Sequence, residues 1–315
     1  MADTISKNNK LKPLACATTS SAIMQALVVG LAVYSVLSWG KTCIGSMQLH
    51  PNANISILQG NINIDMQRNR HYYTLNELLK YYRKLLGDTA PPGLCLWTEN
   101  ALPAYLLQEP GLKRELSKIS TVNNEDQIIG ALDQDHARHP FNSVFGITCN
   151  GTTLPSVYHK RYLVPFGEYT PEAVKYLPEW LQHLTNTPAG TGFSSGQKTV
   201  VLSFPSGKVA PMICFEALSP ELAQQSVMAG GQLLVNLCDL AWFHHSMIGN
   251  QMIAFSVLRA VENHRYFVFA ANFGPSAIID PAGRIVARLS PGIERRLSGH
   301  IEFCSQKTMF SSWFR

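Results

Sequence analysis

The sequence predicts an α/β protein in which layers of β-sheet are covered by helices, preceded by one membrane-spanning helix. Short apolar segments with strand-like patterns follow one another in large number, and helix-like segments fill only some of the connections between them. An uncharged stretch also runs from residue 14 to residue 40. We therefore expect an amino-terminal tail and membrane anchor over residues 1–50 and a single domain over residues 51–315.

The composition is that of a globular chain with a large core. Of the 315 residues, 46% are hydrophobic and 15% are charged, which supplies ample apolar surface for burial. The net charge of +5 comes from scattered lysines and arginines rather than from a basic run, which argues against a nucleic-acid partner. The 7 cysteines form no Cys-x-x-Cys pair, so their spacing predicts neither a metal site nor a disulfide framework.

The amino-terminal apolar segment is densest between Ile23 and Trp39, which is long enough to cross most of a hydrocarbon layer as a helix. Lysines cluster before it and only Lys41 follows closely, so the amino terminus should be cytoplasmic and the domain outside the cytoplasm. In a bacterium this describes a single-pass inner-membrane protein with a periplasmic domain. A cleaved signal peptide is the alternative, although no clean small-x-small cleavage site follows Trp39. A buried core helix is disfavoured, because apolar side chains run all round the segment.

Within the domain, strands are expected at residues 53–62 and 94–99, on either side of a helix at 71–86 whose apolar side chains recur at helical spacing. Two neighbouring strands should follow at 127–132 and 141–151. The segment 170–198 is rich in proline and glycine, and we expect a loop or lid there.

The second half of the domain should begin with a hairpin at 198–213. A helix at 220–230, a strand at 231–239 and a helix at 247–265 are expected next. A strand at 266–274 and a final hairpin around an Asp-Pro-Ala-Gly turn complete the series.

Three strand ends carry side chains that could do chemistry together. Cys214 stops a buried strand just before a helix, where a thiolate could act as a nucleophile, although free cysteine is often buried for packing alone. Glu99 ends another apolar run, and a partly buried carboxylate can serve as a general base. Lys160 follows a third, and its ammonium group could stabilise an oxyanion. Taken singly, Glu99 could be an ordinary loop carboxylate and Lys160 a solvated lysine.

Several motifs together carry a resemblance that none of them carries alone. In chain order they are "LWTENALP", "YHKRYLVPFGEYTP", "MICFEALSPEL", "LLVNLCDLAWF" and "RAVENHRYFVFAANFGPSAIIDPAGRI". This set resembles the nitrilase superfamily of carbon–nitrogen hydrolases, and it looks most like the apolipoprotein N-acyltransferase branch. The resemblance covers about residues 54–289.

The resemblance implies a nitrilase-type α-β-β-α sandwich with a catalytic triad of Glu99, Lys160 and Cys214. In that superfamily the cysteine attacks a carbonyl, the glutamate moves the proton and the lysine stabilises the tetrahedral intermediate, so an acyl-thioester forms. This chemistry requires no metal and no organic cofactor. The superfamily also implies a homodimer, whereas the acyltransferase branch usually acts as a monomer.

Three further residues fall on motifs of the branch. Glu168 and Glu216 would orient Lys160 or the substrate, because a lysine in an apolar cleft needs a counter-charge. Trp242 would line the substrate pocket, with core packing as its alternative.

Several positions depart from the acyltransferase branch. The sequence Cys238-Asp239-Leu240 stands where Ser-Asn-Asp is common, Phe215 replaces a tyrosine beside the nucleophile, and Met252 replaces a histidine. One membrane span is expected where the branch has several. The triad is intact, so these departures point to altered substrate recognition.

Three functions therefore remain open. The first is a membrane-anchored N-acyltransferase that passes an acyl group from a phospholipid to a lipoprotein or another amine. The second is a tethered amidase or nitrilase-type hydrolase. The third is a degenerate module that serves an assembly such as a conjugal-transfer system.

Overall fold

The computed structural model describes residues 15–62, 74–87, 91–178, 192–243 and 246–313. The chain divides into two units, Met1–Leu49 and His50–Arg315, and each is described by itself.

The first unit contains the helix α1 (Ala15–Ser46). Its segment Ser21–Ser46 has a mean hydropathy of 1.8. At a rise of about 1.5 Å per residue the segment extends about 39 Å, more than the roughly 30 Å of a hydrocarbon layer. By length and composition this helix could cross a membrane, as a signal sequence also could.

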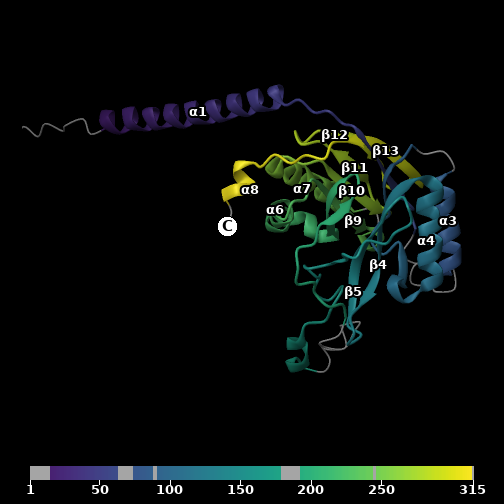
Figure 1. Cartoon of the computed structure of the whole chain (residues 1–315). Coiled ribbons are helices and arrows are strands. Elements are labelled where there is room, and N and C mark those ends of the chain that lie inside the picture. The colour runs from purple at the N-terminus through teal and green to yellow at the C-terminus, as the bar shows by residue number, and fades with distance from the viewer. Residues whose placement is uncertain (1–14, 63–73, 88–90, 179–191, 244–245, 314–315) are drawn as a thin grey trace, which may run out of the picture. The chain divides into compact units, whose positions relative to one another are not determined.

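The second unit is built on two β-sheets (Figure 1). The strands of the first sheet are β1 (Ala53–Gln59), β2 (Gly93–Leu96), β3 (Leu102–Tyr105), β4 (Glu125–Gln134), β5 (Pro140–Ile147), β6 (Tyr158–His159) and β13 (Arg295–Ile301). Over the described residues they run in the order β13-β1-β2-β4-β5-β6, with β3 beside β4.

The strands of the second sheet are β7 (Leu202–Phe204), β8 (Gly207–Ile213), β9 (Leu233–Asp239), β10 (Phe267–Asn272), β11 (Ser276–Ile279) and β12 (Ile285–Leu289). They run in the order β12-β11-β10-β9-β8-β7 over the same described part of the chain. The two sheets face each other, with β1 against β10 and β12 against β13.

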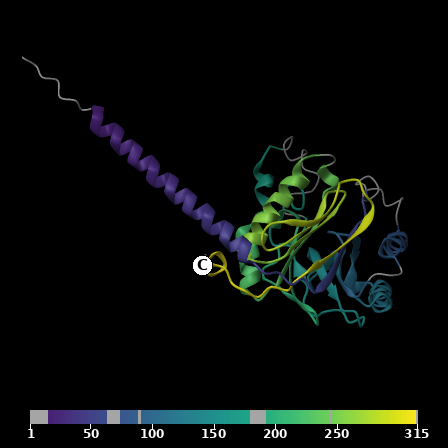
Figure 2. The same cartoon turned by 90° about the horizontal axis from the view of Figure 1, so that it is seen from above.

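Helices cover the outer faces of this sandwich (Figures 1 and 2). The helices α3 (Leu75–Leu86) and α4 (Pro110–Asn123) pack on the first sheet, and α6 (Pro220–Met228) and α7 (Ile248–Asn263) pack on the second. A short carboxyl-terminal helix, α8 (Met309–Trp313), contacts α6 and α7. The predicted α-β-β-α sandwich is therefore confirmed.

The helix expected at 71–86 is α3, which begins after Thr74. The Thr74 side chain accepts from the backbone of Glu77 while Glu77 accepts from the backbone of Thr74, a reciprocal cap that fixes the start of the helix. Residues 71–73 lie outside the described part of the chain. So do residues 179–191 of the expected loop, whose earlier part contains a 3₁₀ turn at Glu172–Tyr176.

Parallel strands bring the candidate site residues to one edge of the sandwich. In the first sheet β2 is parallel to β1 and to β4, and in the second β9 is parallel to β8 and to β10. Parallel strands bring their carboxyl ends to the same edge of a sheet. Glu99 follows β2, Cys214 follows β8 and Asp239 ends β9, so these residues meet there.

Candidate active site

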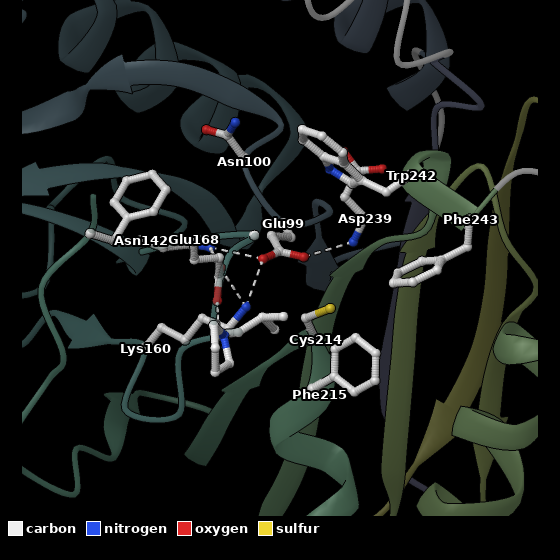
Figure 3. Close-up of a pocket in the computed structure, with 14 residues that line it drawn as sticks. Glu99, Asn100, Asn142, Lys160, Glu168, Cys214, Phe215, Asp239, Trp242 and Phe243 are labelled. Atoms are coloured by element: carbon white, nitrogen blue, oxygen red, sulfur yellow. Dashed lines mark hydrogen bonds and ion pairs between the residues drawn. The ribbon is translucent and has the colours of Figure 1, made fainter. Parts of the chain in front are cut away.

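A cavity of about 390 Å³ opens at this edge of the sandwich (Figure 3). Its lining includes five of the six residues that the sequence singled out, Glu99, Lys160, Glu168, Cys214 and Trp242. Its other walls are largely apolar and include Val164, Pro165, Phe193, Phe215 and Phe243. The sixth residue, Glu216, is not part of the lining.

Glu99 is held in place by a close approach between two strands. The buried strand β2 leads through Trp97, whose indole Nε1 donates to Gln127 at 2.8 Å. On β4, a Cβ at position 130 would lie 2.3 Å from the carbonyl oxygen of Thr98 and 2.9 Å from Cα of Glu99. Only a glycine at position 130 lets the Glu99 segment pass this close to β4.

Three donors orient the carboxylate of Glu99. Oε1 accepts from Asn142 Nδ2 at 2.8 Å and from Lys160 Nζ at 3.3 Å, and Oε2 accepts from the backbone N–H of Asp239 at 2.8 Å. The sequence did not single out Asn142, which lies mid-strand in β5 without a motif around it. It also did not single out the backbone of Asp239 for this role.

Lys160 is a buried cation between two carboxylates. Its backbone N–H donates to Asn142 O at 2.8 Å, its side chain is 1% exposed, and Nζ lies 2.7 Å from Oε1 of Glu168. Burial alone would lower the pKa of this ammonium, but the charges of Glu99, Cys214 and Glu168 outweigh burial and raise the pKa above its usual value. Lys160 is therefore positively charged throughout the physiological range.

Glu168 bridges this cation and the loop that carries it. Its Oε1 also accepts from Asn142 Nδ2 at 3.3 Å, and its Oε2 accepts from the backbone N–H of Val164 at 2.9 Å. The carboxylate thus supplies the second counter-charge that a buried ammonium needs.

Cys214 occupies a strained turn at the end of β8. It starts a 3₁₀ helix, Cys214–Leu218, with a φ of 55°, a left-handed conformation that costs a residue with a side chain about 1–3 kcal/mol. Its side chain is buried but lines the cavity. Such strain concentrates at functional sites, because it aims a side chain that a relaxed turn would point elsewhere.

Glu216 does not line the cavity, but its carboxylate holds together the backbone segments that carry the site residues. Its Oε1 accepts from the backbone N–H groups of Arg161 and Tyr162 at 2.6 and 3.0 Å, and its Oε2 accepts from Tyr158 Oη and the N–H of Ile213, both at 2.7 Å. Burial raises the pKa of Glu216 despite these donors. The residue ties the chain just after Lys160 to the chain just before Cys214.

Trp242 is 53% exposed at the mouth of the cavity, so it is not a core residue. Beside it, Phe215 and Phe243 meet edge to face with ring centroids 5.8 Å apart (Figure 3). These three aromatic side chains form an apolar entrance to a polar floor.

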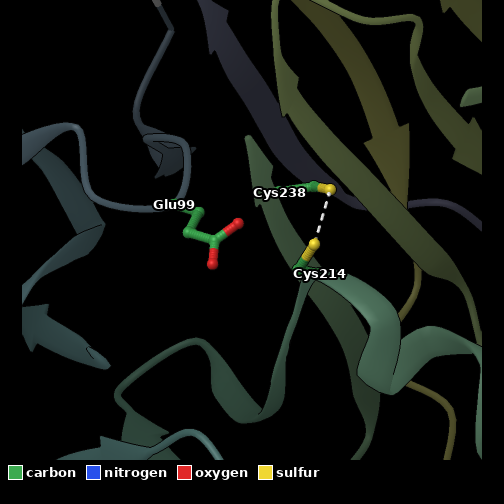
Figure 4. Close-up of side chains that lie close together, drawn as sticks. All are labelled: Glu99, Cys214 and Cys238. Carbon is green, nitrogen blue, oxygen red and sulfur yellow. Dashed lines mark hydrogen bonds between the residues drawn. The ribbon is translucent and has the colours of Figure 1, made fainter. Parts of the chain in front are cut away.

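Among the residues that the structure describes, one group has the composition of a metal site. An oxygen of Glu99 and the sulfurs of Cys214 and Cys238 all lie within 4.8 Å of one another (Figure 4). Both oxygens of Glu99 already accept hydrogen bonds, and the ammonium of Lys160 supplies positive charge beside them. Burial, together with the hydrogen bond to Cys214, raises the pKa of Cys238 well above its usual value, so Cys238 is a protonated thiol. The group is therefore better described as a carboxylate beside two cysteine side chains than as a metal centre.

Curated relatives share most of this domain. An apolipoprotein N-acyltransferase of Geobacter metallireducens is 32% identical over 271 residues, which is 82% of this chain and 50% of that protein. One of Rhodopseudomonas palustris is 31% identical over 286 residues, 85% of this chain and 52% of that protein. The chain thus spans about half the length of the curated relatives it matches.

Solved structures share the fold. Saccharomyces cerevisiae Nit3, a member of branch 10 of the nitrilase superfamily, superposes with a TM-score of 0.58 at 16% identity, covering 82% of this chain and 92% of that one. A carbon-nitrogen hydrolase from Helicobacter pylori gives a TM-score of 0.59 at 15% identity, covering 80% and 89%. At such identities the likeness establishes the fold alone.

A family model adds to these likenesses. The model described as carbon-nitrogen hydrolase matches residues 74–303, a span that runs from α3 to just past β13 and includes every residue lining the cavity. The resemblance in the motifs is thereby confirmed: the chain belongs to the carbon-nitrogen hydrolase family.

Proposed function

We propose that this chain is a membrane-anchored N-acyltransferase of the nitrilase superfamily, which passes an acyl group from a phospholipid to an amine through a thioester on Cys214. One observation carries the proposal: a nucleophile, a buried cation and a carboxylate line the same cavity as Cys214, Lys160 and Glu99. The similarity to proteins named apolipoprotein N-acyltransferase supports the choice of donor and acceptor, although the chain spans only half of them.

The first half-reaction would load the enzyme. Cys214 Sγ attacks the ester carbonyl carbon of the phospholipid while its proton passes to Glu99, and the negative charge that develops on the carbonyl oxygen is stabilised by Lys160. The tetrahedral intermediate then expels the glycerol oxygen, which takes the proton back from Glu99. A lysophospholipid leaves and an acyl-thioester remains on Cys214.

The second half-reaction would unload it. The acceptor amine attacks the thioester carbonyl and gives a proton to Glu99, and Lys160 again stabilises the oxyanion. The carbon–sulfur bond breaks, Cys214 recovers its proton, and an amide leaves the cavity. Because Glu168 also neutralises Lys160, the cation keeps a counter-charge while Glu99 is protonated.

The walls of the cavity suit an acyl chain. Its apolar lining and the entrance formed by Phe215, Trp242 and Phe243 would exclude water from a thioester, which favours transfer to an amine over hydrolysis. Anchoring through the helix α1 would keep the enzyme at the bacterial inner membrane, which contains the donor lipids. A periplasmic orientation and a homodimer remain predictions.

The test follows a labelled acyl chain. The full-length protein in detergent is given a phospholipid labelled in its acyl chain, together with a peptide that begins with a diacylglyceryl-cysteine and has a free amine. Label should appear on the peptide amine and disappear in Cys214→Ala, while Cys149→Ala, a half-buried cysteine outside the cavity, should transfer normally.

The same assay separates the alternatives. A hydrolase would release free fatty acid, and it would do so at the same rate whether the peptide has a free amine or is N-acetylated. Equal label on the peptide in wild type and Cys214→Ala would exclude Cys214 as the nucleophile, and a complete lack of turnover would favour a non-catalytic module.

A further inference from the structure

We propose that Cys238 is a resolving cysteine, which forms a reversible disulfide with Cys214 after a hydroperoxide has oxidised Cys214. The inference rests on the geometry of the two sulfurs and does not depend on the acyl donor or acceptor of the proposed function.

The pairing of β8 with β9 places the two cysteines side by side. These strands are parallel, and the last paired residues in register are Ile213 and Leu237. Cys238 is the next residue of β9, and Cys214 is the first residue after the end of β8. Neighbouring strands lie about 4.8 Å apart, and the Cα atoms of disulfides lie about 4.4–6.8 Å apart, so the backbone spacing suits a bond.

The side chains point at each other. Cys238 Sγ donates a hydrogen bond to Cys214 Sγ at 3.5 Å (Figure 4). A disulfide needs the sulfurs at about 2.05 Å, so they must approach by about 1.5 Å. Cys214 lines the cavity and has open space on one side, so side-chain rotation rather than strand movement can supply this approach.

Burial sets the order of events. Cys238 is 0% exposed and is not part of the cavity lining, whereas Cys214 faces the cavity. A small hydroperoxide in this 390 Å³ cavity therefore reaches Cys214 first. Cys238 can react only with what forms on Cys214.

The first step oxidises Cys214. Its sulfur attacks one oxygen of the hydroperoxide, a sulfur–oxygen bond forms and the oxygen–oxygen bond breaks. The Cys214 thiol proton passes through Glu99 to the departing oxygen, which leaves as water or an alcohol. The sulfur loses two electrons and becomes a sulfenic acid, and the hydroperoxide is reduced by the same two electrons.

The second step forms the disulfide. Cys238 Sγ attacks Cys214 Sγ, the sulfur–sulfur bond forms, and the sulfenic oxygen leaves as water. The Cys238 proton needs a base, and an oxygen of Glu99 lies within 4.8 Å of both sulfurs. The disulfide would protect the nucleophile from irreversible oxidation and would block its chemistry until a thiol reduces it.

The test uses mass spectrometry rather than acyl transfer. Reduced full-length protein is treated with hydrogen peroxide, alkylated in denaturant and digested without reduction. We expect a linked peptide pair containing Cys214 and Cys238, and dithiothreitol should restore alkylation at both positions. Failure of the proposed acyl transfer would leave this result untouched.

Cys238→Ser is the decisive variant, because serine keeps the shape and a hydrogen-bond donor beside Cys214. Without the resolving sulfur, Cys214 should proceed to the sulfinic acid, and the thiol recovered by dithiothreitol should fall about tenfold or more. Cys304→Ser is the matched control, because Cys304 is also buried but lies away from Cys214. The backbone N–H of Cys304 donates to Gln232 O, at the opposite end of β9. It should behave as wild type, and thermal unfolding checks that both variants are folded.

Two outcomes would overturn the proposal. One is the absence of the linked pair in wild type, with Cys214 reaching the sulfinic acid as fast as it does in Cys238→Ser. The other is a disulfide that joins Cys214 to a cysteine other than Cys238.

Discussion

Lys160 Nζ lies 2.7 Å from Glu168 and 3.3 Å from Glu99, so the closer counter-charge comes from the carboxylate outside the proposed triad. A buried ammonium with two carboxylates stays charged and compensated when one of them takes up a proton. In the proposed mechanism this arrangement would let Glu99 carry protons while Lys160 keeps its position.

Replacing Glu168 with glutamine should therefore change how activity depends on pH. The negative charge of Glu168 helps to raise the pKa of Lys160, so its removal lowers that pKa. The alkaline limb of the rate profile should move to lower pH, and the rate at neutral pH should fall about tenfold. Initial rates of Glu168→Gln across the pH range measure both effects.

The control for this experiment is Glu172→Gln, because Glu172 pairs with Lys175 on the surface at 3.3 Å. It should leave the profile unchanged. An alkaline limb at the wild-type pH in Glu168→Gln would show that Glu168 does not set the charge state of Lys160.

Glu216 should couple stability to pH. Its pKa is raised in the folded state, so the folded protein binds this proton more tightly than the unfolded chain does. The contribution of Glu216 to stability is thus greatest at acidic pH and is lost as pH rises above about 4.5 through the raised pKa. Compared with Glu216→Gln, wild type should lose more of its free energy of unfolding across this window.

Denaturant unfolding at several pH values measures this difference, with the exposed Glu221→Gln as a control. The glutamine variant should also be less stable overall by about 1–3 kcal/mol, because its amide cannot accept from all the donors around Glu216. Parallel pH dependences in wild type and Glu216→Gln would contradict the assignment.

Gly130→Ala should lower activity by displacing Glu99, although Gly130 itself does not line the cavity. The added Cβ would lie 2.3 Å from Thr98 O, so the backbone that carries Glu99 must move. We expect a loss of about 1–3 kcal/mol in stability and at least about a tenfold loss in rate. Gly111→Ala is the control, since its Cβ meets nothing within 4 Å, and it should be neutral or slightly stabilising. A fully active Gly130→Ala enzyme would mean that the position of Glu99 is not critical.

Trp242→Ala should affect substrate rather than stability. Because the side chain is 53% exposed, its removal should change the free energy of unfolding by less than about 1 kcal/mol. The KM for a long-chain acyl donor should rise about tenfold while that for a short-chain ester changes little. Equal effects on both donors would argue against a role in holding the chain. Trp97→Ala, at a fully buried site, should instead destabilise the fold by about 3–5 kcal/mol.

The sequence predicted most of the fold, because the alternation of apolar residues in strands and their helical spacing in helices can be read from neighbouring residues alone. The elements that it did not predict include the short strand β3 and the short helix α8, and the two larger ones are α4 and β13. The helix α4 covers the first sheet, but its sequence "PGLKRELSKISTVN" has only a narrow apolar face, formed chiefly by Leu112, Leu116 and Ile119. The strand β13 pairs with β1 more than 230 residues away, and all its side chains except that of Ile301 are exposed or half-buried, so no alternating apolar pattern marks it.

Site residues that belong to sequence motifs could be predicted, whereas residues that reach the site only through strand pairing could not. Glu99, Lys160, Cys214 and Glu168 stand in recognisable motifs, and the structure brings them to one cavity. Asn142 has no such motif, and its place between two carboxylates depends on the pairing of β5 with β6. The contact between Cys238 and Cys214 likewise depends on the register of β8 and β9.

The central claim is that Cys214 carries an acyl group, and the mass of Cys214 in protein taken from its native membrane tests it most directly. We predict a fraction of Cys214 peptide that is heavier by one fatty acyl group and is labile to hydroxylamine, as thioesters are. Unmodified Cys214 in every sample, including after incubation with excess phospholipid, would contradict the account.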